Sequence, residues 1–248
     1  MKAVAVISQK GGAGKTTLAV SLSALAEQHG YQTVLFDLDP QASAGKWGAR
    51  RDGVPPDVVD AHAPRLPAAL TSAAKQDRTL AVIDTAPHAN KAAEDAARVA
   101  DIVLVPARPD LIDLEAIGES LEAASRAGRP AFVVLNAVPP NHPSGDEAAA
   151  SLASNGIGVC PVRIHRRQAF SNAYTEAKTV TEWEPGGKAA QEIEALWSWL
   201  CGQVGIPEHQ QARTTTQPNN KMPAMPEVAI AAPPKARKTA RPKRVVTA

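Results

Sequence analysis

The sequence has few of the residues that cross-link a protein or anchor it in a membrane. Its 248 residues include two cysteines, Cys160 and Cys201, and neither stands in a Cys-x-x-Cys pair or at metal-ligand spacing. We interpret both as reduced structural thiols. The chain has no apolar run near the roughly 20 residues of a membrane-spanning helix, and no basic leader followed by an apolar stretch. We therefore expect a cytoplasmic protein without a membrane partner.

Aromatic residues are also scarce, at 4% of the chain against 44% apolar residues. The core must therefore be built mainly from Ala, Val, Leu and Ile, and the chain is long enough for one substantial core. From Pro207 onward the composition changes to Gln, Thr, Asn, Ala and Pro, with eight Lys or Arg against two Glu. We predict a folded domain over 1–206 and a disordered, basic Pro/Ala-rich tail over 207–248.

Short apolar runs alternate with longer amphipathic stretches along the folded part. Because the runs are apolar at consecutive positions, they suit strands that are buried on both faces. The expected strands are 3–8, 33–38, 80–84, 102–106, 131–136 and 158–162. The expected helices are 15–28, 91–100, 114–127, 146–154 and 187–201. This alternation predicts an α/β fold with a doubly wound, mostly parallel sheet flanked by helices. Ligands of such folds bind beyond the carboxyl ends of the strands.

A glycine-rich segment, Lys-Gly-Gly-Ala-Gly-Lys-Thr-Thr, occupies positions 10–17 between the first strand and the first helix. Its backbone N–H groups can converge on phosphate oxygens, helped by the helix dipole. Lys15 supplies a charge to the β- and γ-phosphates, and the Thr16 hydroxyl reaches Mg²⁺. The candidate nucleotide-binding residues of this loop are Gly11, Gly12, Ala13, Gly14, Lys15, Thr16 and Thr17.

The loop departs from the standard pattern G-x-x-x-x-G-K-[ST] in an informative way. Gln9 stands where the first glycine belongs, and Lys10 adds a second lysine. With this second lysine the segment resembles the deviant Walker A loop of the ParA/MinD family of P-loop ATPases, and most closely that of small ParA-type partition ATPases. This resemblance implies that ATP and Mg²⁺ are the cofactors.

Two acidic motifs follow the loop in the order that the family shows. Asp37-Leu38-Asp39-Pro40-Gln41 resembles the family's second acidic motif, which implies that Asp39 positions water and senses the γ-phosphate. The strand that ends at Asp84 resembles a Walker B motif, so Asp84 would bind Mg²⁺ through water. Alone, the first motif is equally a turn and the second is any strand ending in Asp. The implied metal residues are Thr16, Asp39 and Asp84.

The resemblance extends over roughly residues 1–203 and implies further roles. Family proteins seat adenine after late strands of the sheet, where this chain has Asn136 and Pro161, although an Asn there is equally a turn former. Lys10 would reach the nucleotide of a second subunit, so that ATP joins a homodimer. The implied catalytic residues are Lys10, Lys15 and Asp39.

A basic cluster follows the strand expected at 158–162. Arg163, Arg166 and Arg167, with His165 among them, are candidates for non-specific DNA binding, which needs charge and no base reading. The alternative is a solvated or ion-paired surface. The basic tail could add to DNA binding, solubilise the protein or tether a partner.

The function that the resemblance implies is a ParA-like partition ATPase. Such a protein dimerises with ATP on nucleoid DNA and hydrolyses ATP slowly when a ParB-like adaptor stimulates it, which segregates a plasmid or a chromosome. One alternative is a positioning ATPase for a protein cargo. Others are an ATP-dependent small-molecule synthetase or amidoligase, and a binding module that never hydrolyses ATP.

Overall fold

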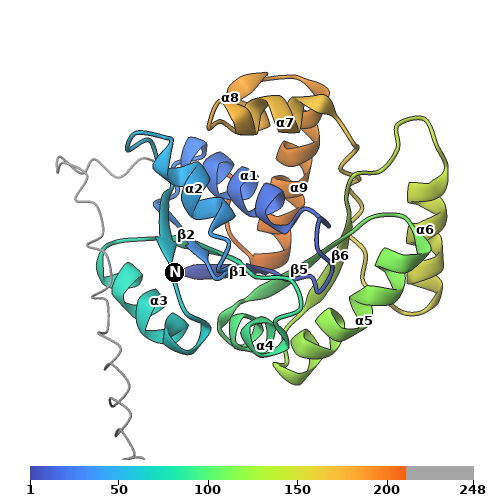
Figure 1. The fold of residues 1–248 in the computed structure, drawn as a ribbon, viewed down its shortest axis with the longest axis horizontal. Coiled ribbons are helices and arrows are strands. Elements are labelled where there is room, and N and C mark those ends of the chain that lie inside the picture. The colour runs from blue at the N-terminus through green and yellow to red at the C-terminus, as the bar shows by residue number, and fades with distance from the viewer. Residues whose placement is uncertain (211–248) are drawn as a thin grey trace, which may run out of the picture.

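The computed structural model describes residues 1–210, which form one six-stranded sheet with all strands parallel (Figure 1). The strands stand in the order β3-β2-β4-β1-β5-β6. Their bounds are β1 (Lys2–Val6), β2 (Thr33–Asp37), β3 (Asp57–Asp60), β4 (Leu80–Asp84), β5 (Ile102–Ala107) and β6 (Ala131–Leu135). The predicted fold class is confirmed.

Helices cover both faces of this sheet (Figure 1). One layer contains α1 (Lys15–Gln28), α2 (Ser43–Ala49), α7 (Gln168–Thr175), α8 (Val180–Trp183) and α9 (Lys188–Val204). The other layer contains α3 (Leu66–Lys75), which follows a short 3₁₀ turn at Ala63–Arg65, then α4 (Asn90–Val99), α5 (Leu111–Arg126) and α6 (Ser144–Ser154). None of the helices in the described residues is long and apolar enough to cross a bilayer.

The strands are apolar at consecutive positions because each face of the sheet has its own core. In β1, Val4 and Val6 pack with α1 and α9, whereas Ala3 and Ala5 pack with α4 and α5 on the opposite face. Side chains alternate between the two faces of a strand, so a doubly covered strand has no polar face. The largest buried aromatic side chains, Trp47, Trp197 and Tyr31, all lie in the α1/α9 layer.

Two sequence predictions about strands are corrected by the structure. Residues 158–162 form no strand, and only an isolated bridge joins Val159 to Val133. Pro161 has no N–H to donate, so it cannot continue a ladder. The sequence analysis also missed β3, which is short, only partly buried and paired with β2 at the edge of the sheet. The helices α2, α3, α7 and α8 were missed as well.

The folded part continues past the predicted boundary at residue 206. Gly205 ends α9 in a left-handed conformation with φ 67°, and the chain then contacts the turn between α1 and β2. The Tyr31 hydroxyl donates to the Pro207 carbonyl, Trp197 Nε1 donates to the Glu208 carbonyl at 3.1 Å, and the Gln210 N–H donates to the His29 carbonyl at 2.8 Å. The rest of the predicted tail, 211–248, lies outside the described residues.

Candidate nucleotide-binding site

The three predicted motifs meet at the carboxyl edge of the central strands. Asp84, at the end of β4, is in register with Asp37 at the end of β2 and with Val6 at the end of β1. The loop after β1 carries the glycine-rich segment. Parallel strands that end side by side place the residues that follow them at one edge, so segments far apart in sequence form one site.

The glycine-rich loop needs its glycines for conformation and for space. Gly12 and Gly14 have φ of 75° and 95°, and Gly14 directly precedes α1. A Cβ on Gly14 would lie 2.0 Å from Nδ2 of Asn136. Asn136 donates from that nitrogen to the Ala13 carbonyl at 2.7 Å, so it holds the loop. Its predicted contact with adenine stays a prediction, as does that of the exposed Pro161.

Lys15 is the buried one of the two lysines in the loop. Its residue is only 7% exposed, and Nζ donates to the Lys10 carbonyl at 3.2 Å. Burial lowers the pKa of Lys15, while the negative charges of Asp84 and Asp39 act in the opposite direction. The ammonium group therefore lies near both acidic motifs, which is where a nucleotide phosphate needs a cation.

Thr16 and Asp84 form the part of the site that suits Mg²⁺. The Thr16 hydroxyl donates to Oδ2 of Asp84 at 2.6 Å. Asp84 is fully buried, and its Oδ1 has no hydrogen-bond partner among the described residues. Burial raises the pKa of Asp84 to about 7. A buried carboxylate oxygen without a donor, beside a hydroxyl, offers the hard oxygen ligands that Mg²⁺ prefers, so these residues fit the ion.

The second acidic motif is held by a residue to which the sequence analysis gave no role. Asp37 Oδ1 accepts the Asp39 N–H at 3.0 Å, and Oδ2 accepts the Gly45 N–H at 2.9 Å. Burial raises the pKa of Asp37, and these N–H donors act in the opposite direction. Asp39 is half-buried and accepts the Gln41 N–H at 2.9 Å. Asp37 therefore fixes the turn that presents Asp39. Its place two residues before Asp39 in the sequence could have indicated this supporting role.

Lys10 contacts its own subunit in this structure. Its Nζ lies 3.7 Å from Oδ1 of Asp113, a residue that is 3% exposed at the start of α5. Asp113 Oδ2 accepts the Arg108 N–H at 3.2 Å, and Arg108 Nη2 donates to the Gly12 carbonyl at 2.7 Å. Arg108 and Asp113 thus support the loop. No sequence motif pointed to them, because they lie about a hundred residues further along the chain.

The predicted DNA-binding arginines are only partly available. Arg163 Nη1 donates to the Cys160 carbonyl at 2.9 Å, and its Nε lies 3.6 Å from Asp146. Arg167 Nε donates to Glu192 at 3.1 Å, and His165 Nδ1 lies 2.8 Å from the same carboxylate. Both arginines are ion-paired in this structure, and DNA binding by this cluster stays a prediction. Arg166 is exposed and has no ion pair within residues 1–210.

Comparison with known proteins agrees with this geometry. The model of the CobQ/CobB/MinD/ParA nucleotide-binding domain matches residues 4–180. The chain belongs to this family. It is 34% identical over 199 residues to maintenance of carboxysome distribution protein A of Gloeobacter kilaueensis, covering 78% of this chain and 89% of that protein. It is 31% identical over 183 residues to protein ParA of Rhizobium radiobacter, covering 69% and 81%.

Solved structures show the same ParA/MinD fold. The ATP complex of a McdA variant from Cyanothece superimposes with a TM-score of 0.68 at 17% identity, covering 85% of this chain and 99% of that one. MinD with Mg-ADP from Pyrococcus horikoshii superimposes with a TM-score of 0.62 at 17% identity, covering 82% and 98%. The resemblance to the ParA/MinD family that the phosphate loop indicated is confirmed.

Proposed function

We propose that this chain is a ParA-type ATPase that uses ATP and Mg²⁺ to switch between a monomer and a DNA-bound dimer. The observation that carries the proposal is the convergence of Lys15, the Thr16–Asp84 pair and Asp39 at one sheet edge. These residues supply a cation that can bind the phosphates, oxygen ligands for Mg²⁺, and a carboxylate that can orient the attacking water. The names of the relatives and the nucleotide-bound structures of the same fold support this assignment.

Each residue has a defined task in the proposed hydrolysis. The N–H groups of the loop and Lys15 would hold the phosphates. Thr16 and Asp84 would hold Mg²⁺, which would supply positive charge to the phosphates during hydrolysis. Asp39 accepts a hydrogen bond from the attacking water and orients it in line with the γ-phosphate. A slow ATPase activity that disappears in Asp39→Ala supports this role. An unchanged rate in that variant would exclude it, and total absence of turnover in the unaltered protein would favour a binding module.

ATP-dependent dimerisation is the next step of the proposal. Lys10 is already held near the loop by Asp113, so it needs only to exchange one anionic partner for another to reach the nucleotide of a second subunit. Light scattering with MgATP should show a dimer for the unaltered protein and a monomer for Lys10→Ala. Lys91→Ala, which removes an exposed lysine paired to Asp95, is the matched control. A dimer that persists in Lys10→Ala would overturn this step.

Non-specific DNA is the proposed binding partner, and Arg166 is the one of the three predicted arginines that is exposed and has no ion pair within residues 1–210. Each phosphate contact adds roughly 0.9 to the slope of log affinity against log salt. Arg166→Ala should therefore lower the slope by about one, whereas Arg167→Ala should leave it unchanged because Arg167 is paired with Glu192. Deleting 222–248 tests the basic tail in the same assay. An equal slope in all variants and in the unaltered protein would refute these contacts.

The proposed location of the protein is the cytoplasm, in association with the nucleoid. The proposed adaptor is a ParB-like protein bound to a plasmid or a chromosome. A protein cargo is the second candidate, because two relatives are named for maintaining carboxysome distribution. A pull-down with the Asp39→Ala variant and MgATP separates these candidates. A captured ParB-like protein supports a plasmid or chromosome, and a captured component of a protein assembly supports a protein cargo.

A third candidate comes from another class, because the fold also occurs in cobyrinic acid a,c-diamide synthase of Mycobacterium smegmatis, with a TM-score of 0.59 at 18% identity. Turnover that rises with DNA and an adaptor, with no small molecule present, supports the ParA-type assignment. Turnover that requires an added carboxylic acid and an amine donor would replace it with a synthetase.

The test that addresses nucleotide and DNA together is DNA binding at several salt concentrations with MgATP, MgADP or no nucleotide. The proposal predicts tight, salt-sensitive and sequence-independent binding with MgATP only. Binding of equal strength in all three states would overturn the switch, and no binding in any state would overturn DNA as the track.

A further inference from the structure

The last described residues, 206–210, cross the turn between α1 and β2, and we call them the C-terminal strap. Three hydrogen bonds join backbone groups of the strap to that turn and to α9. In addition, the Ser198 hydroxyl donates to the Glu208 carboxylate at 2.7 Å. Gly30 leaves room for the strap, because a Cβ there would lie 2.6 Å from the Gln210 carbonyl oxygen. These contacts hold the strap without regular secondary structure.

A pair of histidines lies where the strap meets the body of the protein. His209 of the strap packs on His29, which directly follows α1, with ring centroids 4.0 Å apart and planes inclined by 31°. The Trp197 ring lies 5.9 Å from His29. Nδ1 of His29 is buried and has no hydrogen-bond partner within residues 1–210. A charged imidazole carries a proton on both nitrogens, so protonation would place an N–H at this atom without an acceptor.

The groups around His29 determine how easily its ring takes up a proton. Burial lowers the pKa of His29, and the nearby His209 acts in the same direction. Glu194 of α9 and Glu208 of the strap act in the opposite direction without reversing the shift, and the carboxyl end of α1 also favours a cation. Burial raises the pKa of the remaining titratable groups of this cluster to about 12, so they stay neutral: Tyr31 and Cys201.

We propose that the histidine pair makes the C-terminal strap sensitive to acid: the strap is closed while the rings are neutral, and protonation of the pair opens it. Two imidazolium rings 4.0 Å apart would repel each other. The neutral His29 stabilises the closed strap above the ordinary histidine pKa of about 6.5, and this contribution is lost as the pH falls below that value. Opening frees the indole N–H of Trp197, which is 1% exposed in the closed state.

The strap lies at the end of α1 that is remote from the phosphate loop. This helix has 14 residues and begins at Lys15, so its two ends are about 20 Å apart. We therefore expect the strap to open in acid whether or not ATP is bound, and the test needs no nucleotide.

Hydrogen–deuterium exchange of the full chain tests the proposal, at about one pH unit above and one below the ordinary histidine pKa. Protection factors are compared, so that the pH dependence of intrinsic exchange cancels. The Ile206 and Gln210 N–H groups donate to the Cys201 and His29 carbonyls. Their protection should fall by roughly fivefold or more in acid, whereas the protection of α9 should not.

Two variants separate the contributions of the two rings. His29→Phe keeps an aromatic ring and removes the buried titrating group, so protection of the strap should stay within about twofold between the two pH values. His209→Phe removes the repulsion but keeps the burial of His29, so the fall should be smaller than in the unaltered protein. His62→Phe replaces an exposed histidine far from the strap in sequence, and the full fall should persist in this control.

The outcomes that would overturn the proposal are distinct. One is a strap that keeps its protection in acid, and another is an undiminished fall in His29→Phe or His209→Phe. A simultaneous loss of protection in α9 would show global acid unfolding in place of local opening, and it would overturn the proposal as well. If His29→Phe fails to fold, His209→Phe decides alone, because His209 is exposed and its replacement removes the second charge.

Discussion

Arg51 connects two parts of the chain that flank the nucleotide site, and its replacement should be costly. The side chain is 2% exposed and forms an ion pair with Glu182 of α8 at 2.6 Å. It also donates to the carbonyls of Val54, Pro55 and Ala177, and its guanidinium lies 4.4 Å from the Trp47 ring centroid. This one group therefore joins the segment between α2 and β3 to the turn between α7 and α8.

The magnitude follows from what Arg51→Met leaves behind. The Glu182 carboxylate loses its cation while it stays mostly buried, and removal of one partner of a buried pair costs about 3–5 kcal/mol. Glu182 still accepts the Thr179 N–H at 2.7 Å, so we expect a loss near the lower end of that range in the free energy of unfolding.

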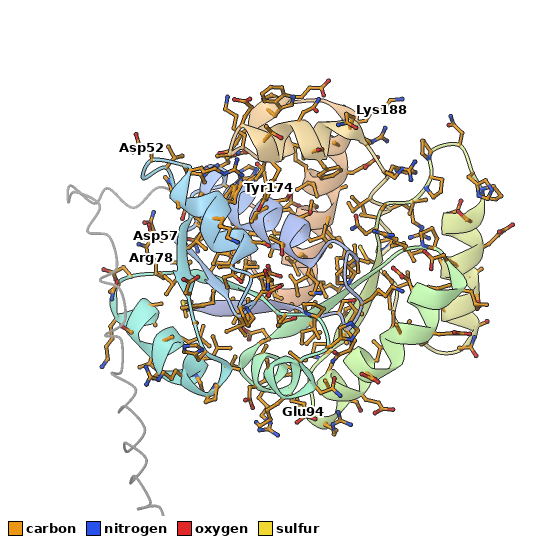
Figure 2. All side chains as sticks on the ribbon, in the orientation of Figure 1. Asp52, Asp57, Arg78, Glu94, Tyr174 and Lys188 are labelled. Atoms are coloured by element: carbon orange, nitrogen blue, oxygen red, sulfur yellow. The ribbon has the colours of Figure 1, made fainter. Side chains whose placement is uncertain are left out.

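Arg50→Met is the matched control, because the neighbouring arginine also donates to α7 carbonyls and lies 5.2 Å from the Tyr174 ring, yet is exposed. Figure 2 shows Tyr174 where α7 lies against α2, and its hydroxyl donates to the Ser43 carbonyl at 2.7 Å. Arg50→Met should cost about 1 kcal/mol or less. Urea denaturation measures both values, and losses within about 1 kcal/mol of each other would refute the burial argument.

Acid adds a second check on the same pair. Burial would raise the pKa of Glu182, but the hydrogen bonds from Arg51 and Thr179 outweigh it and hold this pKa below its usual value. A carboxyl with a lowered pKa in the folded state stabilises the protein above its unfolded pKa, and this contribution is lost as the pH falls through the folded value. The stability gap between the unaltered protein and Arg51→Met should therefore narrow in acid.

Three further predictions concern other groups. Burial raises the pKa of Glu27 to about 7, so its charge destabilises the fold progressively as the pH rises from its unfolded pKa toward 7, by at most about 1.4 kcal/mol per pH unit. Glu27→Gln should remove this slope in denaturation curves, and an unchanged slope would contradict it. Gly14→Ala places a Cβ against Asn136 at a positive φ and should abolish nucleotide binding in calorimetry, whereas Gly118→Ala, where a Cβ meets nothing within 4 Å, should not. Asp84→Asn should bind ADP with an affinity that no longer depends on Mg²⁺, and a retained Mg²⁺ dependence would refute the metal role of Asp84.

Glu27 is a partly buried carboxylate with a raised pKa that does not mark a second active site. Glu27 Oε1 accepts the Thr33 N–H at 2.6 Å, and Asp57 pairs with Arg78 (Figure 2). These groups lie at the amino ends of β2, β3 and β4, opposite the phosphate loop. Their arrangement therefore matters for stability, and the Glu27→Gln prediction tests stability alone.

The parts of the fold that could be predicted are those where one local pattern decides the structure. The bounds of α1 and β4 were predicted without error, because glycines precede the helix and a fully buried strand is apolar throughout. The edge strand β3 and the helix α2 were missed because they are short, and α2 contains two glycines. Residues 158–162 had an apolar pattern, but Pro161 prevented the ladder.

The phosphate loop, the two acidic motifs and their order can be read from the amino-acid sequence alone, because a loop that wraps a phosphate uses contiguous residues. The residues that support these motifs emerge only when the chain is folded. Asp113 reaches Lys10, Asn136 reaches Ala13 and Arg51 reaches Glu182 across about a hundred residues or more. Such contacts depend on which strands end side by side, and no local pattern encodes that. The fold likewise pairs Arg163 with Asp146 and Arg167 with Glu192, which no helical or strand spacing brings together.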